Sequence, residues 1–141
     1  MRIRGDTPYT LEAELTAPVT AWLAGTGHRV VSEVPILGRR ADLIGARDGS
    51  LVAIELKLRD WRKALRQAIA YQLAADRAWV AMPLAAASSA YRERWRFEAD
   101  GVGLLAVDDR GVVRAPIPAG PSPRLLPFLR QRILAVGPPQ P

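Results

Sequence analysis

The chain of 141 residues contains no cysteine and a single histidine, His28, so several kinds of site are excluded. Disulfide bonds and cysteine-ligated zinc need residues that are absent. A Ser-His-Asp triad would depend on His28, which lies in a predicted loop after Gly27 and is better explained as a surface residue. The absence of cysteine fits a reducing compartment, and we expect a cytoplasmic protein.

Long hydrophobic runs are also missing. Residues 1–5 contain no apolar core of a signal peptide, and no segment approaches the roughly 18 apolar residues of a membrane span. We therefore expect no membrane contact. The length suits one domain, for which we predict residues 1–136, followed by a disordered tail at 137–141.

Lysine is scarce, being confined to Lys57 and Lys63, so arginine carries most of the net charge of +6. A basic protein favours polyanionic partners such as nucleic acid. A genome's base composition would give the same richness in arginine, alanine and proline, so the charge alone does not decide the function.

The segment Leu51–Leu58 has the alternation of a β-strand and carries two charges on one side. Successive side chains of a strand point to opposite faces, so alternate apolar residues from Val52 to Leu58 predict a face in the core. Glu55 and Lys57 are left side by side on the other face, where a structural strand would carry ordinary polar residues.

A second strand pattern, residues 39–45, precedes it, and Asp48-Gly49 lies midway between the two. Asp-Gly between strand-like runs is a strong signal for a two-residue hairpin turn with positive φ at both positions. We therefore expect an antiparallel hairpin with a register fixed by this turn.

Counting outward from the turn places Asp42 opposite Glu55 and Arg40 opposite Lys57. Directly opposed residues have Cβ atoms about 4.5–5.5 Å apart, so the two carboxylates should be neighbours. Because like charges repel, something positive must compensate them. A divalent cation with oxygen ligands is as natural a candidate as Lys57.

Asp42, a β-turn and then Glu55-Leu56-Lys57 resemble the signature of the PD-(D/E)XK nuclease superfamily, which has the restriction-endonuclease-like fold. Ala41 stands where the family's pattern has proline. The resemblance covers residues 8–83 and implies an α/β protein with an αβββαβ core, a mixed central sheet flanked by helices. A further helix, a β-hairpin and a short C-terminal helix would follow this core.

The resemblance implies a metal-dependent nuclease that hydrolyses phosphodiester bonds, with DNA favoured over RNA as the nucleic-acid partner. Asp42 and Glu55 would hold Mg²⁺, or Mn²⁺ as a substitute, with the Leu56 carbonyl as a further ligand. Lys57 would orient or help to deprotonate the attacking water. A chain this small lacks obvious recognition insertions, so sequence specificity would call for a homodimer or a borrowed partner.

A predicted helix at residues 8–24, entered through Thr7 and Pro8, precedes the strands. Family members often contribute a glutamate from this helix to the metal site. Glu12 falls inside the apolar stripe and is our favoured ligand, whereas Glu14 lies on its flank and stays open. Both could equally be solvated helix charges.

Asp60 is a good N-cap for a second helix, predicted to run to Asp76 and then to be followed by a parallel strand. Gln67 and Tyr71 match a Gln-x-x-x-Tyr element of exonuclease-like relatives, where the pair contacts nucleic acid or braces the site. A surface glutamine beside a half-buried tyrosine is an equally good explanation. The basic residues expected to contact or support nucleic acid are Arg62, Lys63, Arg66 and Arg40.

The C-terminal third is less informative. Residues 88–100 predict a helix in which two aromatic residues alternate with arginine; it could face a phosphate backbone, but we favour simple packing. A hairpin is predicted within 102–114, a loop at 116–123 and a short helix at 125–136.

Two alternatives to the nuclease are open. The domain could keep the fold as a nucleic-acid-binding or protein-interaction module that does not cut. The four charged residues could instead form only a surface ion-pair cluster; they are Asp42, Glu55, Lys57 and Arg40.

Overall fold

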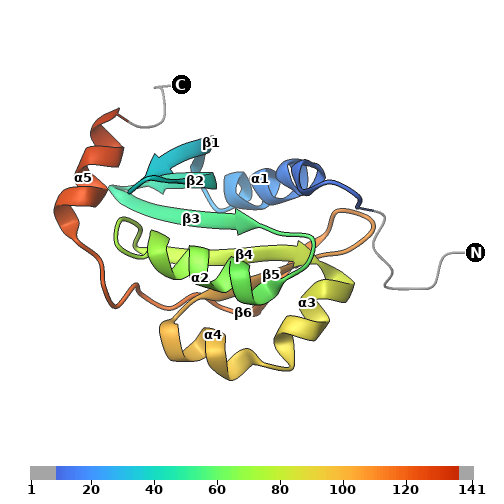
Figure 1. Cartoon of the computed structure of the whole chain (residues 1–141). Helices are drawn as coiled ribbons and strands as arrows, with labels where there is room; N and C mark the ends of the chain where they lie inside the picture. The colour runs from blue at the N-terminus through green and yellow to red at the C-terminus, as the bar shows by residue number, and fades with distance from the viewer. Residues whose placement is uncertain (1–8, 137–141) are drawn as a thin grey trace, which may run out of the picture.

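The computed structural model describes residues 9–136, which form one six-stranded sheet with helices on both faces (Figure 1). In chain order the elements are the 3-10 helix η1 (Glu12–Leu15), α1 (Thr16–Gly25), β1 (Arg29–Ile36), β2 (Arg39–Arg47), β3 (Ser50–Leu56), α2 (Trp61–Tyr71), β4 (Arg77–Pro83), α3 (Leu84–Tyr91), α4 (Arg94–Asp100), β5 (Gly103–Val107), β6 (Val113–Ile117) and α5 (Pro127–Val136). The α/β class is confirmed, and the order as far as β4 is the predicted helix, three strands, helix and strand.

The strands lie in the sheet in the same order as in the chain. β1, β2 and β3 are antiparallel neighbours, β4 and β5 continue the sheet parallel to β3, and β6 turns back antiparallel. A parallel connection needs a crossover, which α2 provides between β3 and β4, and which α3 with α4 provides between β4 and β5. The prediction of a mixed sheet is therefore confirmed.

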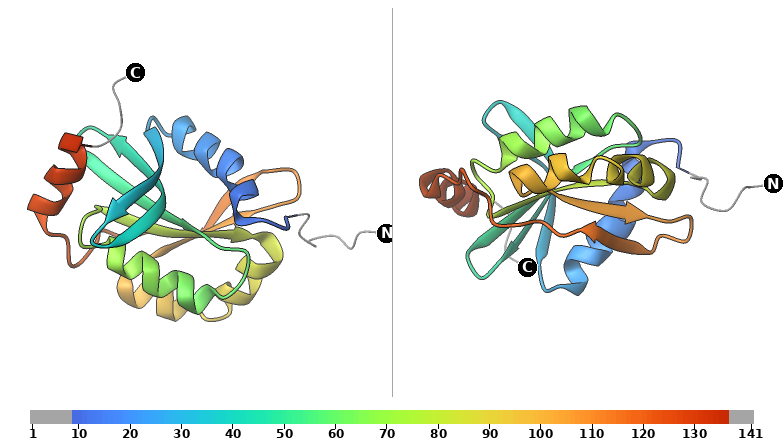
Figure 2. Two further views of the ribbon diagram at one scale, coloured as in Figure 1. Left: turned by 45° about the horizontal axis from the view of Figure 1, so that its top comes forward. Right: turned by 90° about the horizontal axis from the view of Figure 1, so that it is seen from below.

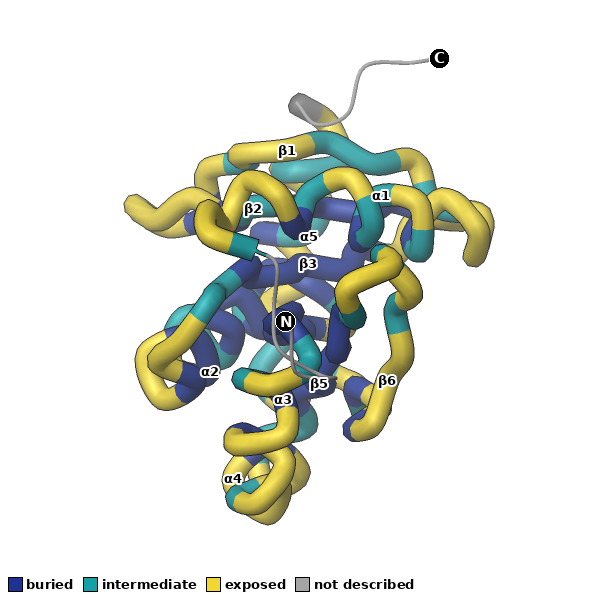
Figure 3. Tube along the Cα trace, turned by 90° about the vertical axis from the view of Figure 1, so that its right-hand side faces the viewer, coloured by how far each residue is buried: buried dark blue, intermediate teal, exposed yellow. Residues whose placement is uncertain are grey.

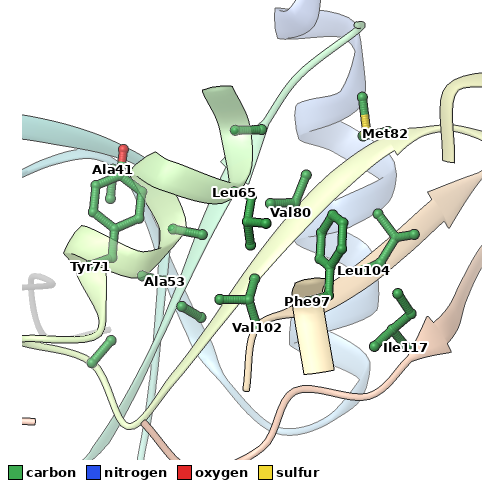
Figure 4. Close-up of a cluster of buried hydrophobic side chains, with 14 of the residues drawn as sticks. Ala41, Ala53, Leu65, Tyr71, Val80, Met82, Phe97, Val102, Leu104 and Ile117 are labelled. Carbon is green, nitrogen blue, oxygen red and sulfur yellow. The ribbon is translucent and has the colours of Figure 1, made fainter. Parts of the chain in front are cut away.

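Helices cover both faces of this sheet (Figure 2). Beneath α1, a cluster of buried apolar side chains includes Leu15, Val19 and Leu23. Beneath α2, α3 and α4 lies a larger cluster, part of which Figure 4 shows. Within residues 9–136 no helix is both long and apolar enough to cross a membrane.

Burial on both faces corrects one expectation about β3. Leu51 and Ala53, on the same side as Glu55, are 0% exposed, so this face is also part of the core. The physical reason is the α2 crossover, which places a helix over the face that an isolated hairpin would leave in water.

The hairpin between β2 and β3 turns at Asp48 and Gly49, as predicted, with φ of 52° and 79°. Its register runs from Arg47 opposite Ser50 to Leu43 opposite Ile54. The predicted register is confirmed over this range, but the ladder stops one pair short of Asp42 and Glu55.

The N-terminal helix begins at Glu12 rather than at residue 8. Its start is fixed by Glu14, whose carboxylate accepts the backbone N–H groups of Thr10 and Leu11 at 2.9 and 2.8 Å. Such a capping box satisfies N–H groups that have no partner inside the helix. Thr7 and Pro8, the predicted entry, lie outside the described residues.

Other boundaries differ where tertiary contacts replace helical ones. Asp60 caps α2 as predicted, but this helix ends at Tyr71 because Asp76 forms two hydrogen bonds with Leu51 of β3. The helix predicted at 88–100 is two helices, α3 and α4, separated at Glu93 by non-helical backbone. The predicted loop at 116–123 loses its first two residues to β6, and the expected tail at 137–141 lies outside the described residues.

Candidate active site

The predicted catalytic residues lie at the carboxyl end of β3, between η1 and α2, at the end of the molecule that faces the viewer in Figure 3. At this end of the sheet β2 is no longer paired with β3. The Leu56 N–H donates to Asp42 Oδ2 at 2.8 Å, so a side chain of β2 takes the bond that a strand carbonyl would otherwise accept. The carboxylate of Asp42 is thereby fixed against β3.

Asp42 and Glu55 are neighbours, as predicted. Burial has the largest effect on both groups and raises the pKa of each; that of Glu55 reaches about 7. The negative charge of Asp42 also raises the pKa of Glu55. The pair therefore holds one proton readily and becomes doubly charged only at a cost.

Glu55 is nearly enclosed, with 6% of its surface exposed. The Tyr71 hydroxyl, at the end of α2, lies 2.6 Å from Glu55 Oε1 and 3.1 Å from the Arg40 carbonyl oxygen. Burial and Glu55 raise the pKa of Tyr71 far above its ordinary value, so its phenol keeps its proton. The Tyr71 ring and Ala41 belong to the same buried cluster, in which Figure 4 labels both.

The two contacts of Tyr71 explain how Glu55 can hold a proton. A tyrosine hydroxyl has one hydrogen and can donate it to one acceptor only. When Glu55 is protonated, its own O–H can donate to Tyr71 while Tyr71 donates to the Arg40 carbonyl. When Glu55 is ionised, Tyr71 donates to the carboxylate and the carbonyl loses its bond.

Lys57 follows directly after β3 and is mostly shielded, with 18% of its side chain exposed. Its Nζ lies 3.8 Å from Glu12 Oε2. The positive charge of Lys57 lowers the pKa of both Asp42 and Glu55, so this ammonium partly offsets the carboxylate pair.

The two helical glutamates, Glu12 and Glu14, have different contacts. Glu12 faces the site, where it pairs with Lys57 and its charge raises the pKa of both Asp42 and Glu55. Glu14 is held by the backbone of Thr10, whose N–H donation lowers the pKa of this glutamate. Its carboxylate is therefore used to start the helix.

Arg40 does not join the site through its side chain. The predicted pairing of Arg40 with Lys57 is wrong: Arg40 pairs with Pro35 of β1, and the Lys57 N–H donates to the Ala81 carbonyl of β4. The reason is the separation of β2 from β3 beyond Leu43. The Arg40 guanidinium is exposed and lies 4.0 Å from Glu33. With Glu55 buried, a purely surface ion-pair cluster is not what these residues form.

The residues of α2 that were predicted to support the site or contact nucleic acid differ in burial. Gln67 is partly buried, and its side-chain oxygen has no hydrogen-bond partner among residues 9–136. A buried acceptor without a donor is costly, so this oxygen is suited to a water or substrate group. The predicted basic flank is exposed and consists of Arg62, Lys63 and Arg66.

The donor set suits Mg²⁺ better than zinc. Within residues 9–136 no three carboxylate or imidazole side chains form a metal-binding group on their own. Mg²⁺, however, is commonly bound through one or two carboxylates with water completing the octahedron, and Asp42 and Glu55 supply two adjacent carboxylates. Glu12 is engaged by Lys57, and the Leu56 carbonyl stays a predicted ligand.

Comparison of the chain with protein-family models, curated proteins and solved structures found no match. The chemistry of the site therefore has to be argued from its own residues. One functional feature was not predicted from the sequence: Trp95 and Arg96, assigned to packing, are exposed. The repeated Trp-Arg pair, at 61–62 and again at 95–96, was the signal available in the sequence.

Proposed function

We propose that the protein is a metal-dependent nuclease that hydrolyses phosphodiester bonds, with DNA as the favoured substrate. The observation that carries the proposal is the adjacent pair Asp42 and Glu55 with Lys57 beside it at one end of the sheet. Two adjacent carboxylates that are largely shielded from water need a cation if both are to be ionised. The nearby ammonium of Lys57 suits a reaction in which negative charge develops in the transition state.

Each residue has a distinct part in the proposed reaction. Asp42 and Glu55 would hold Mg²⁺, which when bound acts as a Lewis acid on a phosphate oxygen and lowers the pKa of water. Tyr71 donates to Glu55 Oε1, so Oε2 would be the oxygen left for the ion. Lys57, released from Glu12 or shared with it, would orient the attacking water and offset charge on the phosphoryl oxygens.

The assay is incubation with labelled duplex, branched and single-stranded substrates in parallel with Mg²⁺, Mn²⁺ or EDTA. Cleavage should need the metal and should be lost in Asp42→Asn. Glu98→Gln, which removes a carboxylate from an exposed position on α4, is the matched control and should cleave normally. A protein that binds no Mn²⁺ in calorimetric titration, with or without oligonucleotide, is not this nuclease.

One observation favours the non-cutting alternative. Glu55 is buried and its Oε1 accepts a hydrogen bond from Tyr71, so the protein itself supplies one partner for this carboxyl group. A module that binds nucleic acid without cutting it would need no metal at Glu55, and this carboxyl group would exchange its proton only with the solvent. Metal titration separates the two, because only the nuclease should release a proton when Mn²⁺ is added near neutral pH.

A further inference from the structure

A groove runs between α2 and α4, which lie side by side on one face of the sheet (Figure 2). Trp61 of α2 lines the groove, and its ring packs against the fully buried Phe97 of α4, with the two ring centroids 5.8 Å apart. The groove has a volume of about 350 Å³ and lies apart from Asp42 and Glu55, neither of which lines it.

Each wall of the groove carries a tryptophan followed by an arginine. On α2, the Arg62 guanidinium lies 4.4 Å from the centroid of the Trp61 ring, and on α4 that of Arg96 lies 4.7 Å from the Trp95 ring. The two tryptophans differ in exposure. Trp61 is 8% exposed and belongs to the core, whereas Trp95 is 58% exposed, which leaves much of a large aromatic ring in water.

The groove is also positively charged. Arg62, Arg66 and Arg96 are exposed, and none of them pairs with a carboxylate in the described part of the chain. Asp100 lines the groove too, but it is paired with Arg124 at 3.1 Å. Three arginines are therefore left for an anionic ligand.

We propose that this groove binds single-stranded nucleic acid, with a base stacked on Trp95 and phosphates on Arg62, Arg66 and Arg96. An exposed aromatic ring beside unpaired arginines matches the two groups that an unpaired strand offers. In a duplex the faces of the bases are stacked on one another, so Trp95 would have nothing to stack on. An acidic protein segment would use the arginines but would leave the exposed ring unexplained.

The groove and the carboxylates are close enough to act on one strand. Lys57 and Trp61 are four residues apart, so the α2 wall begins within about 14 Å of the candidate site. The inference rests on the proposed function, because it names an unpaired strand as the substrate class of that nuclease. It can still be tested alone, since binding needs no metal.

The test is fluorescence anisotropy in EDTA with labelled oligo(dT) and a duplex, each of about 15 nucleotides in length. Oligo(dT) should bind more tightly than the duplex. Trp95→Ala should weaken oligo(dT) binding at least about fivefold, and Trp95→Phe should restore most of it. Phe128→Ala is the matched control, since Phe128 is 60% exposed but lies on α5, and it should have no effect.

Charge is tested by a second pair of variants. Replacing both Arg66 and Arg96 by alanine should reduce the slope of log affinity against log salt by about 1.4 for a single strand. Replacing Arg110 and Arg132, which are also exposed but lie elsewhere, should change the slope much less.

Three results would overturn the inference: equal binding of duplex and oligo(dT), binding indifferent to Trp95→Ala, or equally strong binding of a poly-glutamate peptide. The last would make the groove a docking surface for acidic proteins. Binding that depends on Trp95 in a protein that cleaves nothing in Mg²⁺ would refute the nuclease and support the groove. Metal-dependent cleavage with binding indifferent to Trp95 would refute the groove alone.

Discussion

Replacing Glu55 by glutamine should stabilise the protein above neutral pH, although it removes a residue from the centre of the site. The side chain is 6% exposed, and burial raises its pKa from 4.5 to about 7. Glutamine keeps the shape and can still accept the Tyr71 hydrogen bond, but it never carries the charge that burial disfavours.

The magnitude follows from linkage. A carboxyl group with a raised pKa in the folded state binds its proton more tightly there than in the unfolded chain. Its contribution to stability is present below pH 4.5 and is lost as the pH rises to about 7 and beyond. The difference between these two pKa values corresponds to about 3 kcal/mol in the free energy of unfolding.

Urea unfolding of the wild type and Glu55→Gln, measured from about pH 4.5 to 8 without metal, gives the difference directly. The two proteins should be similar at the acid end, and the variant should gain on the wild type as the pH rises. Glu98→Gln removes an exposed carboxylate and should give a flat difference. A flat or opposite curve for Glu55→Gln would show that Glu55 is ionised without strain, and the reasoning about its burial would be wrong.

Added metal should narrow the difference in stability between the two proteins. Mn²⁺ at ten times its dissociation constant stabilises a folded protein that binds it by about 1.4 kcal/mol. The wild type should gain this increment near neutral pH, and Glu55→Gln should gain little, because it lacks one of the two carboxylates. Stabilisation of both proteins to the same extent would place the ion elsewhere.

Three further predictions follow from single contacts. Lys57→Met should still bind Mn²⁺ in calorimetry but cleave about a hundredfold more slowly, because it removes a group that assists water and not a ligand. Glu14→Ala should lower the melting temperature, since its carboxylate caps the first helix, and should leave the Mn²⁺ affinity unchanged. Gly103→Ala should lower stability by about 1–3 kcal/mol in urea unfolding, because a Cβ there would lie 2.3 Å from a ring carbon of Trp79; Gly25→Ala, with nothing within 4 Å, is the control.

Much of the sheet could be predicted because its signals are local. Asp48-Gly49 fixed the β2–β3 turn and its register through the positive φ that the turn needs. The ends of helices were less predictable, because distant residues decide them. The link between Asp76 and Leu51, which ends α2 early, joins residues 25 positions apart.

In the candidate site, too, the features set by local sequence signals could be predicted and those set by distant residues could not. Adjacency of Asp42 and Glu55 followed from the hairpin, but the departure of β2 beyond Leu43 did not, because it depends on a side chain replacing a strand carbonyl. Burial of Glu55 was not expected either. Alternation within β3 indicates which residues share a face, but only the crossover helix determines whether that face meets water.

Helix α2 connects the two parts of the proposed activity. Its inner face ends at Tyr71, which holds Glu55, and its outer face carries Arg62 and Arg66 in the groove. Because a helix with one face packed into the core is rigid, a strand bound on the outside has a fixed position relative to the carboxylates on the inside. The core contacts of α2 therefore matter to both. Leu65→Ala, which removes a buried side chain that also lines the groove, should disturb strand binding directly and metal binding through the packing of α2.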